Sequence, residues 1–176
     1  KAKRPVSREE FVVAALYKFA NLPDYREIQP VVLKLCKEVG ALGTILLAKE
    51  GINGTICAPQ ASMATILEWF ASEPRFDTLS LKFSLTTEQA FLRMKVRLKN
   101  EIVTMGMPEI DPARQTGIYI DATEWNKLIA DPDVMLIDTR NTYETAIGMF
   151  KGAVDPKISN FRDFPSWAQA LANQDD

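Results

Sequence analysis

The stretch LLAKEGINGTICAP, from Leu46 to Pro59, consists of two apolar runs on either side of a glycine-containing centre. Gly51 and Gly54 tolerate the positive φ angles that tight connections require, and asparagine tolerates them better than most residues. We therefore predict a β-hairpin whose strands, GTILLAKE and NGTICAP, are joined at residues 51–54. This hairpin lies at the centre of the pattern that decides the fold.

Three polar residues fall at the predicted tip: Lys49, Glu50 and Asn53. Two interpretations of the tip are open. In the first, residues 49–54 form only a turn. In the second, the backbone N–H groups of residues 51–54 and the Lys49 ammonium form an anion-binding nest. The local pattern favours the turn.

The segments around the hairpin show the periodicities of further strands and helices. YREIQPVVLKLCKEVG has apolar residues at helical spacing and Gly40 as its C-cap. Pro30 is tolerated only near a first turn, so this helix is expected to begin near Ile28. In chain order we predict a strand at 11–20, this helix, the hairpin, a helix at 62–73, and strands at 78–86 and 91–106. This order is that of an α+β ferredoxin-like or acylphosphatase-like domain.

The second half of the chain differs from the first in charge and in pattern. Residues 1–110 carry 15 Lys and Arg against 12 Asp and Glu, a net +3, whereas residues 111–176 carry 6 against 11, a net −5. The change falls at the proline-bearing segment MPEIDPARQTG, so we predict two domains, 1–110 and 111–176. In the second, GIYI is predicted as a strand followed by a helix capped near residues 121–123. The apolar VMLIDTR is typical of a strand in a parallel α/β sheet.

The segment FLRMKVRLK alternates strictly between apolar and basic residues, so a strand here would carry all its cations on one face. These cations are Arg93, Lys95, Arg97 and Lys99. One interpretation is the ordinary solvated outer face of a sheet. The other is a surface for an anionic partner such as a nucleic-acid backbone, because four cations unrelieved by a carboxylate repel one another. Contacts to phosphates would give affinity without sequence specificity.

Composition restricts the chemistry. The chain has no histidine, which excludes Ser-His-Asp and Cys-His arrangements and histidine-containing zinc sites. Its two cysteines, Cys36 and Cys57, suit core positions better than nucleophilic ones, and so few cysteines indicate a reducing cytoplasm. No apolar run approaches the roughly 18 residues that span a bilayer. The sequence shows no metal or flavin motif.

A third group of polar residues lies in LIDTRNTYETAIGMFKGA. Asp138 and Arg140 follow the end of the predicted strand, and Glu144 lies four residues beyond Arg140. This spacing suits a structural ion pair or a network at a helix start. Gly148 and Gly152 mark a loop. The role that we expect for these side chains is a polar network that holds the loop in place.

Three motifs, KEGINGTI, RMKVRLKNEIVTMG and LIDTRNTYETAIGMFKGAVDP, together resemble those of the bacterial rhodanese-domain tRNA uridine hydroxylases. The resemblance covers nearly the whole chain. It implies an acylphosphatase-like N-terminal domain followed by an α/β rhodanese-like domain. It also implies oxygen-dependent hydroxylation of the wobble uridine of tRNA, uridine 34, to 5-hydroxyuridine. Molecular oxygen would then be the co-substrate, and the anticodon region of tRNA the partner.

The resemblance also assigns roles to residues. The rhodanese signature is present as Asp138, Arg140, Glu144, Gly148 and Gly152. The cysteine of the family follows a strand that would come after Asp176, so no catalytic residue is expected within this chain. We expect the chain to be part of a longer protein and inactive by itself. Two sources of its stability are open: the intact N-terminal domain, or self-association with a partner chain that completes the incomplete rhodanese sheet. From their charge and position, and not from the resemblance, the RNA-binding candidates are Lys49, Glu50, Asn53, Arg93, Lys95, Arg97 and Lys99.

Two other functions compete with hydroxylation. A complete rhodanese domain could transfer sulfur through a cysteine persulfide, and sulfurtransferase assays would separate that activity from 5-hydroxyuridine formation. The third possibility is an RNA-binding module without catalysis, in which the rhodanese part is a docking surface.

Overall fold

The computed structural model describes residues 10–107, 110, 112 and 117–173. The chain divides into two compact units, residues 1–103 with 111–114, and residues 104–110 with 115–176. We call the first the N-terminal domain and the second the C-terminal unit, and each is described by itself. The predicted boundary segment lies largely outside the described residues, so the division at residue 110 stays a prediction.

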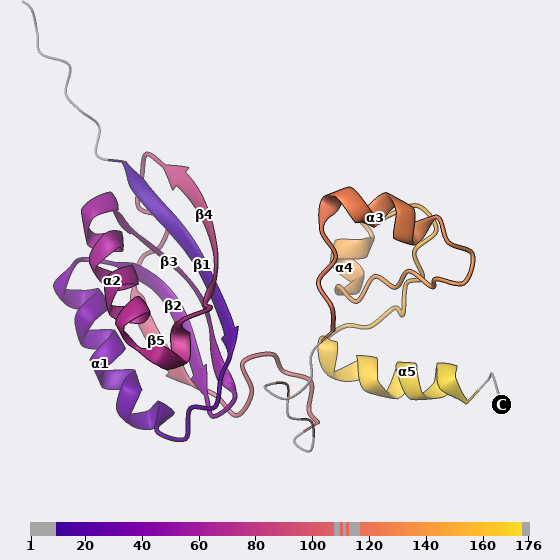
Figure 1. The fold of residues 1–176 in the computed structure, drawn as a ribbon, viewed down its shortest axis with the longest axis horizontal. Helices are drawn as coiled ribbons and strands as arrows, with labels where there is room; N and C mark the ends of the chain where they lie inside the picture. Colours follow the sequence, from indigo (N-terminus) through magenta and orange to yellow (C-terminus); the bar gives the residue numbers. More distant parts are fainter. Residues whose placement is uncertain (1–9, 108–109, 111, 113–116, 174–176) are drawn as a thin grey trace, which may run out of the picture. The chain divides into compact units, whose positions relative to one another are not determined.

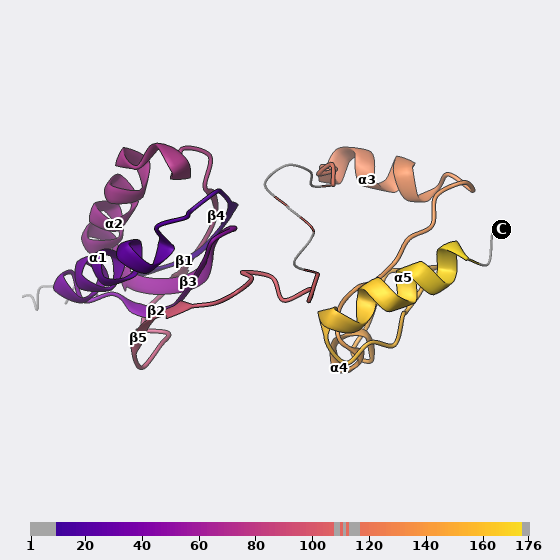
Figure 2. The same ribbon diagram turned by 90° about the horizontal axis from the view of Figure 1, so that it is seen from below.

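The N-terminal domain is a five-stranded sheet in the order β4-β1-β3-β2-β5. Neighbouring strands are antiparallel except β2 and β5, which are parallel. The strands are β1 (Phe11–Phe19), β2 (Leu42–Ala48), β3 (Gly51–Pro59), β4 (Ser80–Thr86) and β5 (Met94–Leu98). The helices are α1 (Tyr25–Glu38) and α2 (Gln60–Ser72), with a short 3-10 helix, η1 (Pro74–Phe76). Both α-helices cover the same face of the sheet (Figures 1 and 2). The predicted α+β, acylphosphatase-like fold is confirmed.

One hydrophobic core lies between the sheet and the two helices. Alternate strand residues such as Leu16 and Ile45 point into it, and Val32 and Cys36 of α1 contribute from one helical face. Phe70 of α2 is 1% exposed. Burying a side chain of this size stabilises a fold by about 1.5–3 kcal/mol. Because buried and exposed residues alternate along the strands, the buried side chains point to one face of the sheet, and the helices cover that face.

Helix α1 begins earlier than predicted. The Asp24 carbonyl oxygen accepts hydrogen bonds from the N–H groups of Glu27 (2.8 Å) and Ile28 (3.1 Å), which close the first turn before Pro30. Pro30 therefore lies inside the helix, on its exposed side, where the carbonyl that loses a partner can be hydrated. The predicted end is confirmed, because Gly40 adopts a φ of 74°.

The turn of the central hairpin lies two residues earlier than predicted. Ala48 pairs with Gly51, so residues 49–50 form the turn and residues 51–54 belong to β3. Gly51 has a φ of 148°, and a Cβ there would lie 2.1 Å from the Lys18 carbonyl oxygen. At Gly54 a Cβ would lie 2.5 Å from a β2 carbonyl oxygen. These glycines are required mainly by the close approach of neighbouring strands.

The C-terminal unit consists of short elements. They are α3 (Ala122–Ile129), α4 (Thr142–Thr145), a 3-10 helix η2 (Phe161–Asp163) and α5 (Phe164–Ala172). The predicted cap of α3 is confirmed, since the Asp121 carboxylate accepts hydrogen bonds from the backbone N–H groups of Thr123 (2.7 Å) and Glu124 (3.2 Å).

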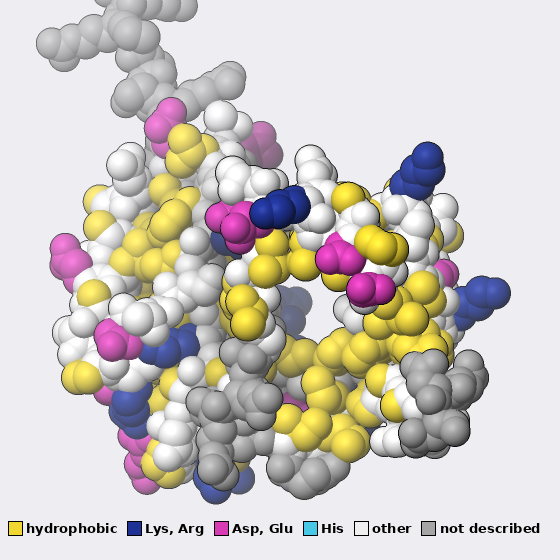
Figure 3. Space-filling model, turned by 45° about the vertical axis from the view of Figure 1, so that its right-hand side comes forward, with side chains coloured by type: hydrophobic (Ala, Val, Ile, Leu, Met, Phe, Trp, Pro, Cys, Tyr) yellow, Lys and Arg dark blue, Asp and Glu magenta, His cyan; other side chains and the backbone are white. Residues whose placement is uncertain are grey.

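The strands predicted in the C-terminal unit are not formed among the described residues. GIYI has no regular structure, and VMLIDTR contributes one parallel bridge, between Ile137 and Val154. A strand needs a partner for its N–H and C=O groups, and none is present beyond this bridge in the described part. Ile118 and Tyr119 are 89% and 88% exposed, and apolar side chains are spread over the surface of this unit (Figure 3). The rhodanese-like assignment stays a prediction.

None of the helices in the described ranges combines the length and the apolar character needed to cross a bilayer.

Candidate nucleic-acid interface

The basic row predicted in FLRMKVRLK is exposed. Arg93, Lys95, Arg97 and Lys99 all lie at the surface, along β5 and its two flanks. Val96 is buried in the core and Met94 packs against it, so the alternation is confirmed there, whereas Leu98 at the end of β5 is 40% exposed. Leu92 departs from the alternation, because this side chain is 96% exposed just before the strand begins.

Strand β5 is held as an edge strand of the sheet. It pairs with β2, with Lys95 beside Thr44 and Arg97 beside Leu46. From the helix side, the Gln29 amide of α1 donates a hydrogen bond to the Val96 carbonyl oxygen (3.0 Å). Since Val96 points to the helices, Lys95 and Arg97 point to the opposite face, which we call the open face.

The four cations keep their charge uncompensated. Among the ion pairs of the described residues, none involves this row; the Lys and Arg partners are instead Lys18, Lys34, Arg75 and Arg140. Exposed cations at an edge attract a polyanion and gain affinity by releasing its counterions. The arrangement therefore suits phosphate binding, and RNA binding by these residues stays a prediction.

The hairpin tip holds a segment of its own domain. The Glu50 carboxylate accepts a hydrogen bond from the Ile102 backbone N–H (2.6 Å), and the Asn53 side-chain amide donates one to the Ile102 carbonyl oxygen (3.1 Å). Ile102 is only 3% exposed. Two of the predicted RNA-binding side chains thus anchor the chain after β5, which ends at Leu98 rather than at the predicted residue 106.

The anion-binding nest is not formed. Residues 51–54 lie in β3 between β1 and β2, so their backbone groups belong to two ladders of the sheet. The carbonyl oxygens of Lys49 and Glu50 accept hydrogen bonds from Leu22 (2.8 Å) and Ala20 (2.9 Å), respectively. Of the three tip side chains, only that of Lys49 is fully at the surface. The attachment of Ile102 to Glu50 and Asn53 was not predicted, because all that the sequence shows at this position is an apolar residue after a basic run.

Neither cysteine is placed for catalysis. Cys36 and Cys57 are both buried and free. Burial raises the pKa of the Cys36 thiol to about 11, so this group stays protonated at neutral pH. Both are buried as predicted, Cys36 in the core between the sheet and the helices and Cys57 on the opposite face of the sheet.

In the C-terminal unit, Arg140 pairs with Asp138 rather than with Glu144. The guanidinium donates to both carboxylate oxygens of Asp138 (2.9 and 2.6 Å) and to the Gly148 carbonyl oxygen (2.7 Å). The hydrogen bonds from Arg140 lower the pKa of Asp138. Glu144 instead accepts hydrogen bonds from the backbone (3.2 Å) and side chain (3.0 Å) of Asn141, at the start of α4. Of the two predicted alternatives, the ion pair between Arg140 and Glu144 is not formed, and the helix-start network and the loop attachment are present.

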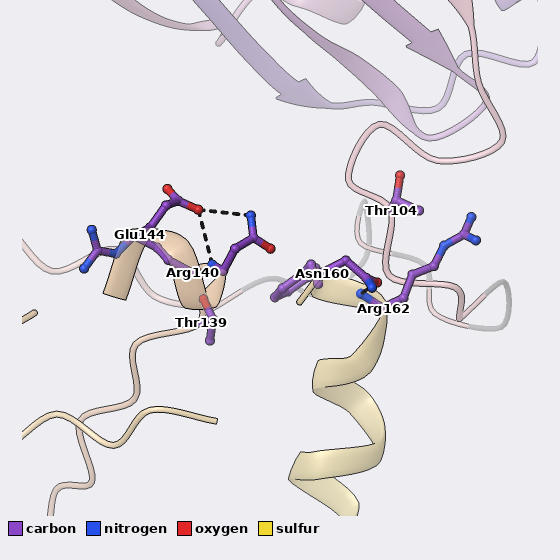
Figure 4. Close-up of a pocket in the computed structure, with 8 residues that line it drawn as sticks. Thr104, Thr139, Arg140, Glu144, Asn160 and Arg162 are labelled. Carbon is purple, nitrogen blue, oxygen red and sulfur yellow. Dashed lines mark hydrogen bonds between the residues drawn. The ribbon is translucent and has the colours of Figure 1, made fainter. Parts of the chain in front are cut away.

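Beside this network the C-terminal unit has a pocket of about 640 Å³. Figure 4 shows Arg140 and Glu144 on one side and Asn160 and Arg162 on the other. The remaining lining residues are Thr104, Thr139, Asn141 and Phe161. The pocket offers hydrogen bonds and two guanidinium groups, and its lining contains no thiol. Within the described ranges no group of acidic or sulfur ligands is arranged to hold a metal ion.

A mixed five-stranded sheet with two helices on one face defines the acylphosphatase-like class of α+β domains. The chain belongs to the UPF0176 acylphosphatase-like domain family, which matches residues 11–102. The predicted acylphosphatase-like N-terminal domain is thereby confirmed.

Curated relatives extend the similarity through both units. A tRNA uridine(34) hydroxylase of Agrobacterium fabrum is 51% identical over 166 residues, covering 94% of this chain and 53% of that protein. Another of the same name, from Rhizobium leguminosarum bv. trifolii, is 51% identical over 160 residues, covering 91% and 52%. The chain therefore spans about half the length of the curated relatives it matches. Among solved structures, an acylphosphatase from Coxiella burnetii is 13% identical with a TM-score of 0.37, covering 51% of this chain and 94% of that one.

Proposed function

We propose that this chain is part of a tRNA uridine(34) hydroxylase that converts the wobble uridine to 5-hydroxyuridine with molecular oxygen as co-substrate. The supporting observation is an identity of about half of all residues to curated relatives of that name, over more than nine-tenths of the chain. The substrate would be tRNA, bound near the anticodon. Free buried cysteines are compatible with the cytoplasm as its location.

Within that enzyme, the N-terminal domain contributes RNA binding. The exposed cations of the β5 row would bind phosphates, while Glu50 and Asn53 fix the segment that follows the row. Replacing Arg93, Lys95, Arg97 and Lys99 by alanine should reduce the slope of log affinity against log salt, by about 0.7–0.9 for each phosphate that is no longer neutralised. Replacing Lys37, an exposed cation of α1 on the helix side, is the control and should leave the slope unchanged.

The activity itself is tested with tRNA that lacks the modification. The 176-residue chain and the full-length protein are incubated separately with that tRNA, and 5-hydroxyuridine is measured by nucleoside mass spectrometry. We expect product from the full-length protein and none from this chain, whose two cysteines are both buried in the N-terminal domain. Absence of product from the full-length protein, with thiosulfate:cyanide sulfur transfer in its place, would contradict the proposal.

The buried cysteines and the uncompensated cations also favour a second function for this chain considered alone, an RNA-binding module without catalysis. RNA binding by the chain without turnover supports it. Detectable hydroxylation by the 176 residues would exclude it.

Self-association is proposed for the C-terminal unit, because Ile118, Tyr119 and Ile147 expose large apolar surfaces. Sedimentation of the chain at several concentrations tests this, and a monomer throughout would contradict it.

A further inference from the structure

The open face of the sheet has a chemistry different from that of the helix-covered face. Along β1, Ala14 and Leu16 are buried in the core, whereas Ala15, Tyr17 and Phe19 point away from it and are partly exposed. Both α-helices lie on the other side (Figures 1 and 2). The five strands are described in full, and none of their residues on the open face is acidic.

Strand register places cations at both margins of this face. One row across the sheet runs Lys82, Ala15, Thr55, Thr44, Lys95. With about 4.8 Å between neighbouring strands, the two lysines are about 19 Å apart along the backbone. Between them lie only alanine and threonine side chains, so the middle of the row is a shallow surface with a positive charge at each end.

The next row brings aromatic rings beside that surface. It contains Tyr17, Asn53, Leu46 and Arg97. The Tyr17 and Phe19 rings are 5.3 Å apart at an interplanar angle of 72°, so the two rings differ in orientation. The Asn53 side chain of this row holds the Ile102 carbonyl oxygen (3.1 Å), so the chain after β5 covers the row at Asn53 and leaves Tyr17 and Phe19 partly exposed. Partly exposed aromatic rings on a sheet, with cations at its margins, provide both components of single-stranded nucleic-acid binding: surfaces on which bases stack, and charges that track the backbone.

We infer that the open face binds a single-stranded RNA segment, with bases stacked on Tyr17 and Phe19 and phosphates at Lys82, Lys95 and Arg97. The inference rests on the proposed function and deepens it by naming an unpaired loop as the bound part. A duplex hides its bases in the stack, so it would reach only the marginal cations. The strands of this face carry cations and no carboxylate, and the Glu50 carboxylate in the neighbouring turn is engaged by the Ile102 N–H, so the charge of the face favours a polyanion over a protein partner.

Binding to a labelled oligouridine of about eight nucleotides and to an RNA duplex of the same length, followed by fluorescence anisotropy, tests the inference with the 176-residue chain. Tyr17→Thr and Phe19→Thr keep a residue that favours strands. Each should weaken oligouridine binding about tenfold and leave the salt slope unchanged. Phe83→Thr is the matched control, because Phe83 is an aromatic residue of the same sheet, 56% exposed on the helix side. It should leave affinity unchanged.

Amide NMR of the unmodified chain provides a test that does not depend on folding of the variants. Oligouridine should shift the signals of Thr44 and Thr55 and leave those of α1 and α2 in place. Equal affinity for duplex and single strand, or loss of affinity in Phe83→Thr alone, would overturn the inference. Aromatic variants that bind normally while the cation variants lose their salt slope would overturn it and leave the proposed function standing. A chain that binds no RNA would overturn both this inference and RNA binding by this domain.

Discussion

The N-terminal domain and the C-terminal unit use similar apolar segments with different results. In the N-terminal domain, GTILLA becomes a strand paired on both sides, with Ile45 and Leu47 completely buried. In the C-terminal unit, VMLI forms a single bridge, and Met135 is 55% exposed. Among the described residues, every buried hydrophobic side chain except Pro156 and Ile158 belongs to the N-terminal domain. An apolar run predicts a strand only where another strand is available to pair with it.

Amide exchange should show the largest contrast between the two units. The Ile56 amide lies in β3 between two strands, so it should exchange only when the domain opens, whereas Ile118 precedes α3 outside any strand. With a domain stability of about 5 kcal/mol or more, Ile56 should exchange at least about a thousandfold more slowly than Ile118. Hydrogen–deuterium exchange followed by NMR measures both. Similar protection of the two amides would show that residues 117–120 have a partner in solution.

The next largest effect should come from opening a cavity in the N-terminal core. Phe70 packs edge-on against Phe76 at 5.3 Å between ring centroids and is 1% exposed. Phe70→Ala should lower the free energy of unfolding by about 3–5 kcal/mol. Phe83→Ala, in the same domain but at an exposed position, should change it by less than about 0.5 kcal/mol. Urea unfolding followed by circular dichroism measures both, and equal losses would contradict a core in which Phe70 is buried and Phe83 contributes little.

The comparison also explains which parts of the fold were predictable from sequence. The order of strands and helices in the N-terminal domain follows from local periodicity, and it was correct because every predicted strand there finds a neighbour. Element ends were less accurate. Helix α1 begins at Tyr25 because the carbonyl oxygen of Asp24 closes its first turn, and the hairpin turn falls at residues 49–50 because Gly51 packs against β1.

The candidate site was predictable where it depends on alternation and not where it depends on tertiary contacts. The β5 cations are exposed as their spacing indicates. Glu50 and Asn53 were expected at an exposed tip, yet they bind the Ile102 backbone across 52 and 49 residues of sequence. The aromatic residues of the open face were missed, because only the strand register shows that Tyr17 lies in the same row as Arg97.

Removing the hydrogen bonds that hold Ile102, near the end of the N-terminal domain, should lower the stability of that domain by an intermediate amount. Glu50→Ala leaves the Ile102 N–H without its acceptor and should lower stability by about 1–3 kcal/mol. Glu50→Gln retains an acceptor oxygen and should recover most of this loss. Thermal unfolding, with exchange of the Ile102 amide, measures the effect.

Lys49→Ala is the control for the anchor, because Lys49 is the exposed neighbour in the same turn. It should change stability by less than about 0.5 kcal/mol. If Glu50→Ala lowered stability no more than Lys49→Ala, the tip would be only a surface turn.

The smallest effect should come from a surface ion network and should depend on pH. Arg75 donates hydrogen bonds to Asp24 and to both carboxylate oxygens of Glu73 (2.8 and 2.9 Å). These hydrogen bonds lower the pKa of Asp24 and of Glu73 in the folded state. A carboxyl group with a lowered pKa stabilises the fold above its unfolded pKa, about 4, and this contribution is lost as the pH falls through the folded value.

Arg75→Gln should therefore reduce the melting temperature at pH 7, and the difference from the unmodified chain should vanish as the pH falls well below about 4. Since the Arg75 side chain is a third exposed, solvent screening should keep the loss below that of Glu50→Ala. Lys37→Gln removes the same charge from an exposed position of α1 and should produce no such pH-dependent difference. A difference for Arg75→Gln that persisted at low pH would show that the guanidinium stabilises the domain by packing rather than through these carboxylates.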